Sequence, residues 1–185
     1  SQQDIPGEEQ ARLLLNRATL LAINRWILDV HGPQATPKHL RTLRKHTVKA
    51  ILGYGDAVLL AAGEYEVSYR AKPDALARVE APCASEAFRA LHRWATQFRF
   101  RPTYGRLSYA EEFERVYEAL GHGDAIHRWF ESRRLGLVAP DWSDYLARFA
   151  AHQQREGSVR GLGQLPRAAL QNAAAYGLPR HRSEL

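Results

Sequence analysis

Asp56 is the carboxylate with the most unusual local sequence in this chain. It directly follows Gly53 and Gly55 in the stretch GYGD, and Lys49 lies seven residues earlier. Each glycine inside a helix costs about 1 kcal/mol relative to alanine, so two within three residues indicate a close approach of helices, a kink, or a bend that presents Asp56 to a ligand. Lys49 is two turns away on the same face, too far for an i, i+4 ion pair. We expect Asp56 to be half-buried and paired, because apolar residues flank it; a purely structural role is equally well supported.

Arg41 and His46 form a second candidate pair. Their Arg-x4-His spacing is the one used by ribonucleases of the HEPN type, in which the histidine acts as general base and the arginine stabilises a phosphate. The chain has 22 Arg among its 26 basic residues, and 8 His, so chance matches to this spacing are expected. The pair supports an alternative hypothesis, that of an RNA-binding or RNA-cleaving helical bundle.

The other reactive residue types do not form a recognisable site. His122 and His127 flank Asp124, but their spacing matches no standard metal motif, and Asp124 is better suited to capping a helix. Cys83 is the only cysteine and has no CxxC partner. We expect no metal site and no cofactor in this chain.

Aromatic and basic residues alternate between positions 93 and 106. A single-strand or RNA stacking platform would have this composition. More often, such a pattern is core on one side with arginine stems lying across the other. The rings are Trp94, Phe98, Phe100 and Tyr104, and the cations are Arg93, Arg99, Arg101 and Arg106.

The composition favours a globular domain that is able to bind anions. The chain has 185 residues, enough to bury roughly 70% of its unfolded surface. Its net charge of +6 rests mostly on arginine, whose fork suits phosphates and carboxylates. No run of five or more like charges occurs, however, so a solvated, Arg-rich surface explains the charge equally well.

Apolar periodicity predicts an all-α fold, an antiparallel helical bundle of about seven or eight helices. Short Gly/Pro and Ser-capped breaks separate them. The predicted helices span residues 8–30, 37–63, 86–100, 109–121, 125–134, 142–155 and 166–176. Residues 64–72 fit a strand or a helix equally well, and Pro73 is expected to end that segment. The predicted domain division is a bundle at 1–156, followed by a Gly-rich loop, short helix and basic tail at 157–185.

The ends and hydropathy of the chain bear on its origin. It begins at Ser1 and contains no methionine, which predicts a processed chain or a piece of a longer protein. The N-terminal residues are polar and acidic, unlike a signal peptide, and no apolar run approaches the roughly 18 residues of a membrane span. These features predict a cytoplasmic protein.

The segment 49–70, KAILGYGDAVLLAAGEYEVSYR, resembles the helical region that follows the catalytic domain in bacterial nucleotidyltransferase-like proteins of the polymerase-beta superfamily. The similarity covers about the first 80 residues. The matching pieces are Asn16-Arg17, Lys49, Gly55-Asp56-Ala57, Leu59-Leu60, Gly63-Glu64-Tyr65, Ser68-Tyr69 and Arg70. The catalytic Gly-Ser with paired acidic residues is absent, because Gly157-Ser158 has no such residues after it.

The resemblance implies a non-catalytic accessory domain that lines a nucleotide or acceptor cleft. Arg17 and Lys49 would contact phosphate, Asp56 would orient them, and Tyr65 and Arg70 would complete the ligand-binding set. Mg²⁺ and a nucleoside triphosphate would belong to the catalytic domain of a parent protein. Besides the HEPN-like bundle, a third reading is a helical module that dimerises through an aromatic face.

Overall fold

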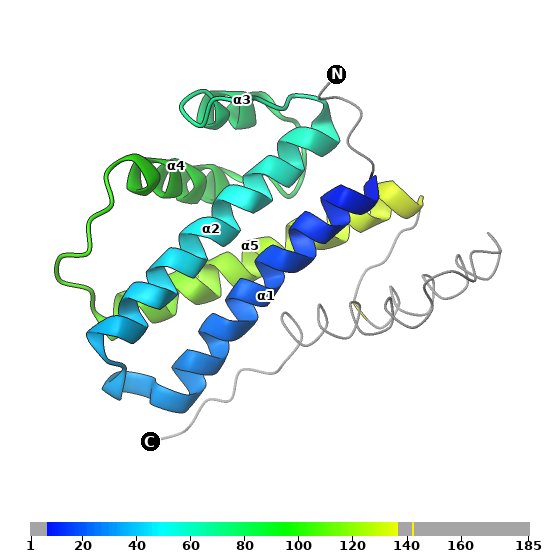
Figure 1. Ribbon diagram of the computed structural model, residues 1–185. Helices are drawn as coiled ribbons and strands as arrows, with labels where there is room; N and C mark the ends of the chain where they lie inside the picture. The colour runs from blue at the N-terminus through cyan, green and yellow to red at the C-terminus, as the bar shows by residue number, and fades with distance from the viewer. Residues whose placement is uncertain (1–6, 137–141, 143–185) are drawn as a thin grey trace.

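The computed structural model describes residues 7–136 and Trp142. These residues form five α-helices and one 3-10 turn, and they contain no strand, so the predicted all-α class is confirmed for this part of the chain (Figure 1). The elements are α1 (Gly7–His31), η2 (Gly32–Gln34), α2 (Pro37–Ala62), α3 (Lys72–Arg78), α4 (Glu86–Phe100) and α5 (Tyr109–Leu135).

Helices α1 and α2 form an antiparallel hairpin (Figure 1). Gly32 takes a φ of 48° at the turn, and the Thr36 side chain accepts a hydrogen bond from the His39 backbone N–H to start α2. Fully buried leucines every seventh residue on α1, such as Leu14 and Leu21, line the face that α2 covers. Helix α2 is the most buried element, because α1, α4 and α5 all pack against it.

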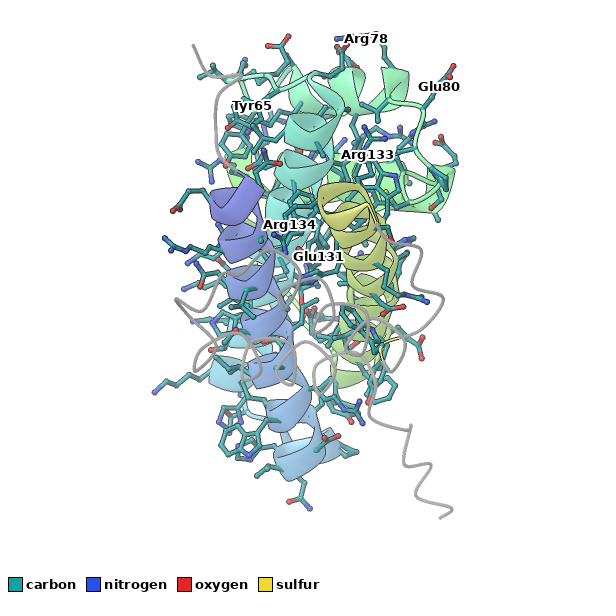
Figure 2. All side chains as sticks on the ribbon, turned by 90° about the vertical axis from the view of Figure 1, so that its right-hand side faces the viewer. Tyr65, Arg78, Glu80, Glu131, Arg133 and Arg134 are labelled. Atoms are coloured by element: carbon teal, nitrogen blue, oxygen red, sulfur yellow. The ribbon has the colours of Figure 1, made fainter. Side chains whose placement is uncertain are left out.

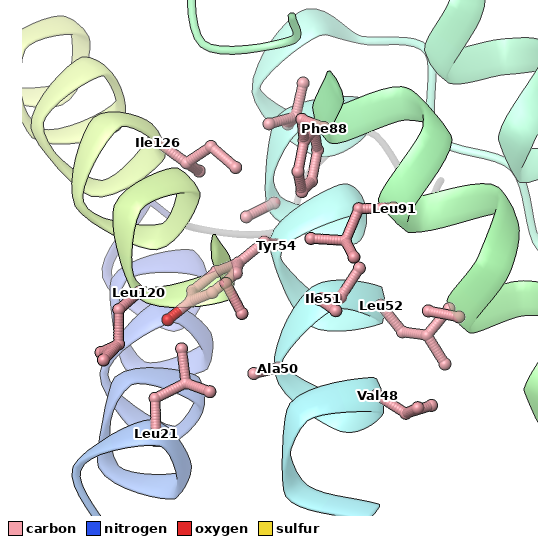
Figure 3. Close-up of a cluster of buried hydrophobic side chains, with 14 of the residues drawn as sticks. Leu21, Val48, Ala50, Ile51, Leu52, Tyr54, Phe88, Leu91, Leu120 and Ile126 are labelled. Carbon is pink, nitrogen blue, oxygen red and sulfur yellow. The ribbon is translucent and has the colours of Figure 1, made fainter. Parts of the chain in front are cut away.

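The third long helix, α5, corrects one prediction. The sequence predicts a break at residues 121–124 with Asp124 as a cap, but α5 runs unbroken through these residues. Gly123 instead makes room for the buried ring of Tyr54, since a Cβ at this position would lie 2.7 Å from that ring. Figure 3 shows Tyr54 reaching from α2 toward Leu21 of α1 and Leu120 of α5. Two predicted helices are therefore one.

Residues 63–71 form an irregular connection rather than the predicted strand or helix. Gly63 ends α2 with a φ of 75°. The prediction that Pro73 ends an element is wrong. Pro73 lies in the first turn of α3, where its missing N–H costs nothing. Helix α4 begins at the predicted cap, Ser85, whose hydroxyl accepts from the Phe88 backbone N–H.

A buried ion pair joins α2 to α5. Arg44 donates through Nε to both carboxylate oxygens of Glu112, at 2.9 and 3.1 Å, and also through a terminal nitrogen. The Glu112 side chain is fully buried, and the rings of Trp94 and Phe98 from α4 lie 5.3 and 5.7 Å from the Arg44 guanidinium carbon. This pair therefore ties three helices together.

None of the described helices is long and apolar enough to cross a membrane. The helices predicted at 142–155 and 166–176, and the division at residue 156, lie outside the described residues. The predicted total of seven or eight helices therefore stays a prediction.

Candidate anion-binding site

Asp56 lies at the C-terminal end of α2, half-buried and paired, as its apolar neighbours predict. Its partner is Lys72, the first residue of α3, whose Nζ donates to Asp56 Oδ1 at 2.6 Å. The Asp56 side chain is 14% exposed, whereas that of Lys72 is 1% exposed. One side of the carboxylate therefore still reaches solvent.

Two tyrosines from the 63–71 connection surround the Lys72 ammonium. Its Nζ lies 3.3 Å from the Tyr65 hydroxyl, 4.6 Å from the centre of the Tyr65 ring and 3.9 Å from the centre of the Tyr69 ring. These contacts replace much of the water that Lys72 loses on burial. Figure 2 shows Tyr65 at the end of the bundle where α2 ends.

The two glycines before Asp56 make room for side chains of the neighbouring helices. Arg17 of α1 crosses Gly53, where an added Cβ would lie 2.4 Å from Nε. His92 of α4 crosses Gly55, where a Cβ would lie 2.4 Å from its ring. Helix α2 continues unbroken through both positions, so the reason for the glycines is close approach and not a bend.

Positive charge exceeds negative charge around Asp56. Besides Lys72, Arg17 and Arg99 lie close enough to lower the pKa of the Asp56 carboxyl. The Nε of Arg17 is buried with no hydrogen-bond partner in the described part of the chain, and the Arg99 guanidinium lies 3.9 Å from the centre of the Tyr69 ring. Three cations therefore share one carboxylate, which leaves donors that a bound anion could use.

Burial and charge act in opposite directions on the ion pair. Desolvation raises the pKa of Asp56 above its usual 3.8, against the hydrogen bond and charge of Lys72 and the charges of Arg17 and Arg99. Burial lowers the pKa of Lys72, but its hydrogen bonds and charge interactions with Asp56 and Tyr65 outweigh this and leave the pKa above its usual 10.5. The pKa values of both groups therefore lie above their usual values.

His92 of α4 lies against α2 near the Asp56–Lys72 ion pair. Its side chain is fully buried, and neither ring nitrogen has a hydrogen-bond partner among the described residues. Burial, reinforced by the charge of Lys72, lowers the pKa of His92 to about 4. At neutral pH, His92 therefore adds no charge to the cluster.

The structure brings together three of the five predicted ligand-binding residues, Arg17, Asp56 and Tyr65. Lys49 is exposed, and its charge acts on His46 rather than on Asp56. Arg70 is exposed too, and its guanidinium lies 5.1 Å from the centre of the Phe100 ring. Lys72 and Arg99 therefore take the positions beside Asp56 that the resemblance assigns to Lys49.

The structure does not bring the alternative ribonuclease pair together. Arg41 and His46 are five positions apart in α2, which places them about 140° apart around the helix axis. Arg41 is exposed, whereas His46 faces α1, where its Nδ1 lies 3.0 Å from Asn24 Oδ1. Asn24 in turn donates to the Leu43 carbonyl at 2.9 Å. His46 thus takes part in an interhelical hydrogen-bond network.

The remaining reactive residues are also dispersed. Among the described residues, no group of three or more His, Cys, Asp and Glu side chains is placed to hold a metal ion. His127 is buried against Trp142, Asp124 forms an ion pair with Arg128, and His122 contacts Phe88. Cys83 is buried, which raises the pKa of its thiol to about 12 and makes it a poor nucleophile.

Sequence reasoning missed Lys72 and His92, and it placed Arg99 only in the aromatic and basic stretch 93–106. Lys72 carries a usable signal, because it is one of only four lysines and directly precedes a helix-starting proline. His92 and Arg99 lie seven residues apart, on one face of α4, but nothing local indicates that this face covers Gly55. Comparisons of the chain with known protein families, curated proteins and solved structures gave no match.

Proposed function

We propose that this chain is a helical accessory domain of a nucleotidyltransferase-like protein, and that it binds the phosphate of a nucleotide or acceptor at the Asp56 cluster. The cluster comprises Arg17, Asp56, Lys72 and Arg99. The observation that carries the proposal is that three cations, Arg17, Lys72 and Arg99, surround a single carboxylate at a place that solvent reaches. Phosphate oxygens accept several charge-assisted hydrogen bonds at once, which is what such a cluster offers.

The roles follow from the contacts. Asp56 holds Lys72 in place through the 2.6 Å hydrogen bond, and Tyr65 and Tyr69 confine the ammonium from the other directions. Arg17 and Arg99 are the phosphate-binding groups, because neither makes a hydrogen bond with another described side chain. Gly53 allows Arg17 to lie close to α2. Transfer chemistry, with its Mg²⁺, is assigned to a catalytic domain of the parent protein.

The resemblance of residues 49–70 supports the same proposal. Asp56 and Tyr65 belong to that stretch, as does the Ser68-Tyr69-Arg70 segment, and Arg17 belongs to the matching part of α1. Three of the five site residues that the resemblance implies, Arg17, Asp56 and Tyr65, thus lie in or beside this cluster. A cluster that served stability alone would be expected to balance its charges.

Isothermal titration of the full chain with pyrophosphate and with ATP tests the proposal. Replacing both Arg17 and Arg99 by Gln should weaken binding at least about tenfold, since each charge-assisted hydrogen bond contributes about 1.5–3 kcal/mol. The matched control, Arg41→Gln with Arg78→Gln, removes two exposed arginines elsewhere and should leave the affinity within about twofold. If both double variants lost affinity equally, net charge alone would explain the loss, and the proposed site would be rejected.

A further inference from the structure

An open pocket with a cavity volume of about 620 Å³ lies beside the C-terminal end of α4. Its lining residues include the aromatic Trp94, Phe98 and Phe100 and the basic Arg70 and Arg101, and none of them is acidic. This volume falls within the range of small-molecule sites in proteins. The pocket therefore combines flat apolar surfaces with uncompensated positive charge.

Other side chains hold Trp94 and Phe98 of this pocket in place. Trp94 lies 4.0 Å from the Arg115 guanidinium and 5.3 Å from that of Arg44, which Glu112 fixes. The Phe98 ring packs edge-on against Tyr104. Phe100, by contrast, is 47% exposed, although phenylalanine is normally buried. Trp94 is only partly exposed and Phe98 is buried, so Phe100 is the most exposed of the three aromatic residues that line the pocket.

Helix-end electrostatics explain only part of the positive charge. Arginines near the C-terminus of a helix interact favourably with its dipole, which accounts for Arg99 in the last turn of α4 and for Arg101 at its C-cap. Arg70 comes from the 63–71 connection and lies over Phe100, at 5.1 Å. Neither Arg70 nor Arg101 forms an ion pair with a carboxylate in the described part of the chain.

We propose that this pocket binds an unpaired nucleotide, with its base on Phe100 and its phosphate between Arg70 and Arg101. A nucleotide unites the two features of the lining, because every base has a flat face for stacking and every phosphate needs cations. The nucleotide comes either from a single-stranded nucleic acid or from a free mononucleotide. The pocket uses none of the four residues of the Asp56 cluster, so this proposal stands independently of the proposed function.

The test measures fluorescence anisotropy of a labelled eight-nucleotide oligothymidylate and of the matching oligouridylate, and calorimetry of AMP, on the full chain. Phe100→Ala should weaken binding by about fivefold to a hundredfold, the range expected for loss of one base–aromatic stack. Trp26→Ala is the matched control, because Trp26 is an exposed ring on α1, 60% exposed, and its loss should change nothing. Arg101→Gln should weaken binding and Arg41→Gln should not.

These measurements distinguish a single strand from a free mononucleotide, and both from a duplex or a polyanion without bases. Binding of the oligonucleotides identifies a strand, binding of AMP alone identifies a free nucleotide, and binding of neither overturns the proposal. The proposal is also overturned if a duplex binds as tightly as the single-stranded oligonucleotides. The same holds if polyphosphate or polyglutamate of equal charge competes as strongly as they do, because a base would then contribute nothing. Arg17→Gln with Arg99→Gln should retain oligonucleotide binding even where pyrophosphate binding is lost. The two proposals can thus fail separately.

Discussion

Two ion pairs that join different helices in the described part of the chain, Arg44–Glu112 and Lys72–Asp56, differ in how completely their charges are matched. Arg44 and Glu112 form a one-to-one pair, with several hydrogen bonds between them and a fully buried carboxylate. Asp56 and Lys72 share a single hydrogen bond, and Arg17 and Arg99 add positive charge beside them. The first pair is complete within the protein, whereas the second has donors left over.

This difference separates a structural role from a binding role. A buried pair that is enclosed by rings and balanced in charge holds helices in register, and it offers a ligand nothing. A pair with surplus cations and a solvent-facing side costs stability through repulsion among like charges, which a bound anion relieves. Proteins often accept such a cost at functional sites.

Removing Glu112 should have the largest effect on stability. Glu112→Ala leaves Arg44 buried without a counter-ion, so the free energy of unfolding should fall by about 3–5 kcal/mol. Urea denaturation followed by circular dichroism measures this loss. A change below about 1 kcal/mol would mean that the pair does not join α2 to α5.

Acidification should destabilise the side of the bundle where His92 lies. Its folded-state pKa of about 4 lies below the usual 6.5, so the stabilisation from neutral His92 is complete above pH 6.5 and is lost as the pH falls toward 4. The expected loss is about 3 kcal/mol. His127, with a pKa also near 4, should contribute similarly.

His92→Gln isolates that contribution, because glutamine does not titrate. The drop in stability between pH 6.5 and 4 should become smaller by about 3 kcal/mol in this variant. The wild type, measured under the same conditions, is the reference for this slope. Identical slopes in wild type and His92→Gln would contradict the burial of a neutral His92.

Asp56→Asn should cost less stability than Glu112→Ala. The asparagine oxygen can still accept a hydrogen bond from Lys72, but the ammonium loses its counter-ion, at a cost of about 1.5–3 kcal/mol, while the partly exposed site lets water approach. The measurement is the same urea titration. Equal losses at Asp56 and Glu112 would erase the distinction between the two pairs.

Gly53→Ala should change stability least while it disrupts the proposed site. The new Cβ would meet the flexible Arg17 side chain, which can move away, and alanine favours the helix by about 1 kcal/mol. We expect a stability change within about 1 kcal/mol and weaker pyrophosphate binding, measured by calorimetry. Gly121→Ala is the control, since a Cβ there meets nothing within 4 Å, and it should bind as the wild type does.

Local patterns in the sequence predict the helices well but predict their partners poorly. Apolar periodicity and the caps at Thr36, Ser85 and Ser108 predict α1, α2, α4 and the start of α5. The break at Gly121–Asp124 is wrong because the ring of Tyr54, 69 residues before Gly123, explains that glycine. A glycine that makes room for a distant side chain has the same local sequence as one that ends a helix.

The same limit applies to the site. The half-buried, paired state of Asp56 follows from its neighbours in the chain, but its pairing with Lys72 depends on how the 63–71 connection returns across the end of α2. That connection has no regular structure, so no periodicity predicts its path. Long-range contacts therefore decide which cations reach Asp56.

The most direct test of anion binding at the Asp56 cluster is a crystal structure of the chain soaked in tungstate, a phosphate analogue with strong anomalous scattering. We predict an anomalous peak within hydrogen-bond distance of Arg17 and Arg99, beside the Asp56–Lys72 pair, and none beside Arg44. Tungstate bound elsewhere on the surface, with the Asp56 cluster empty, would contradict a phosphate-binding role for the surplus cations.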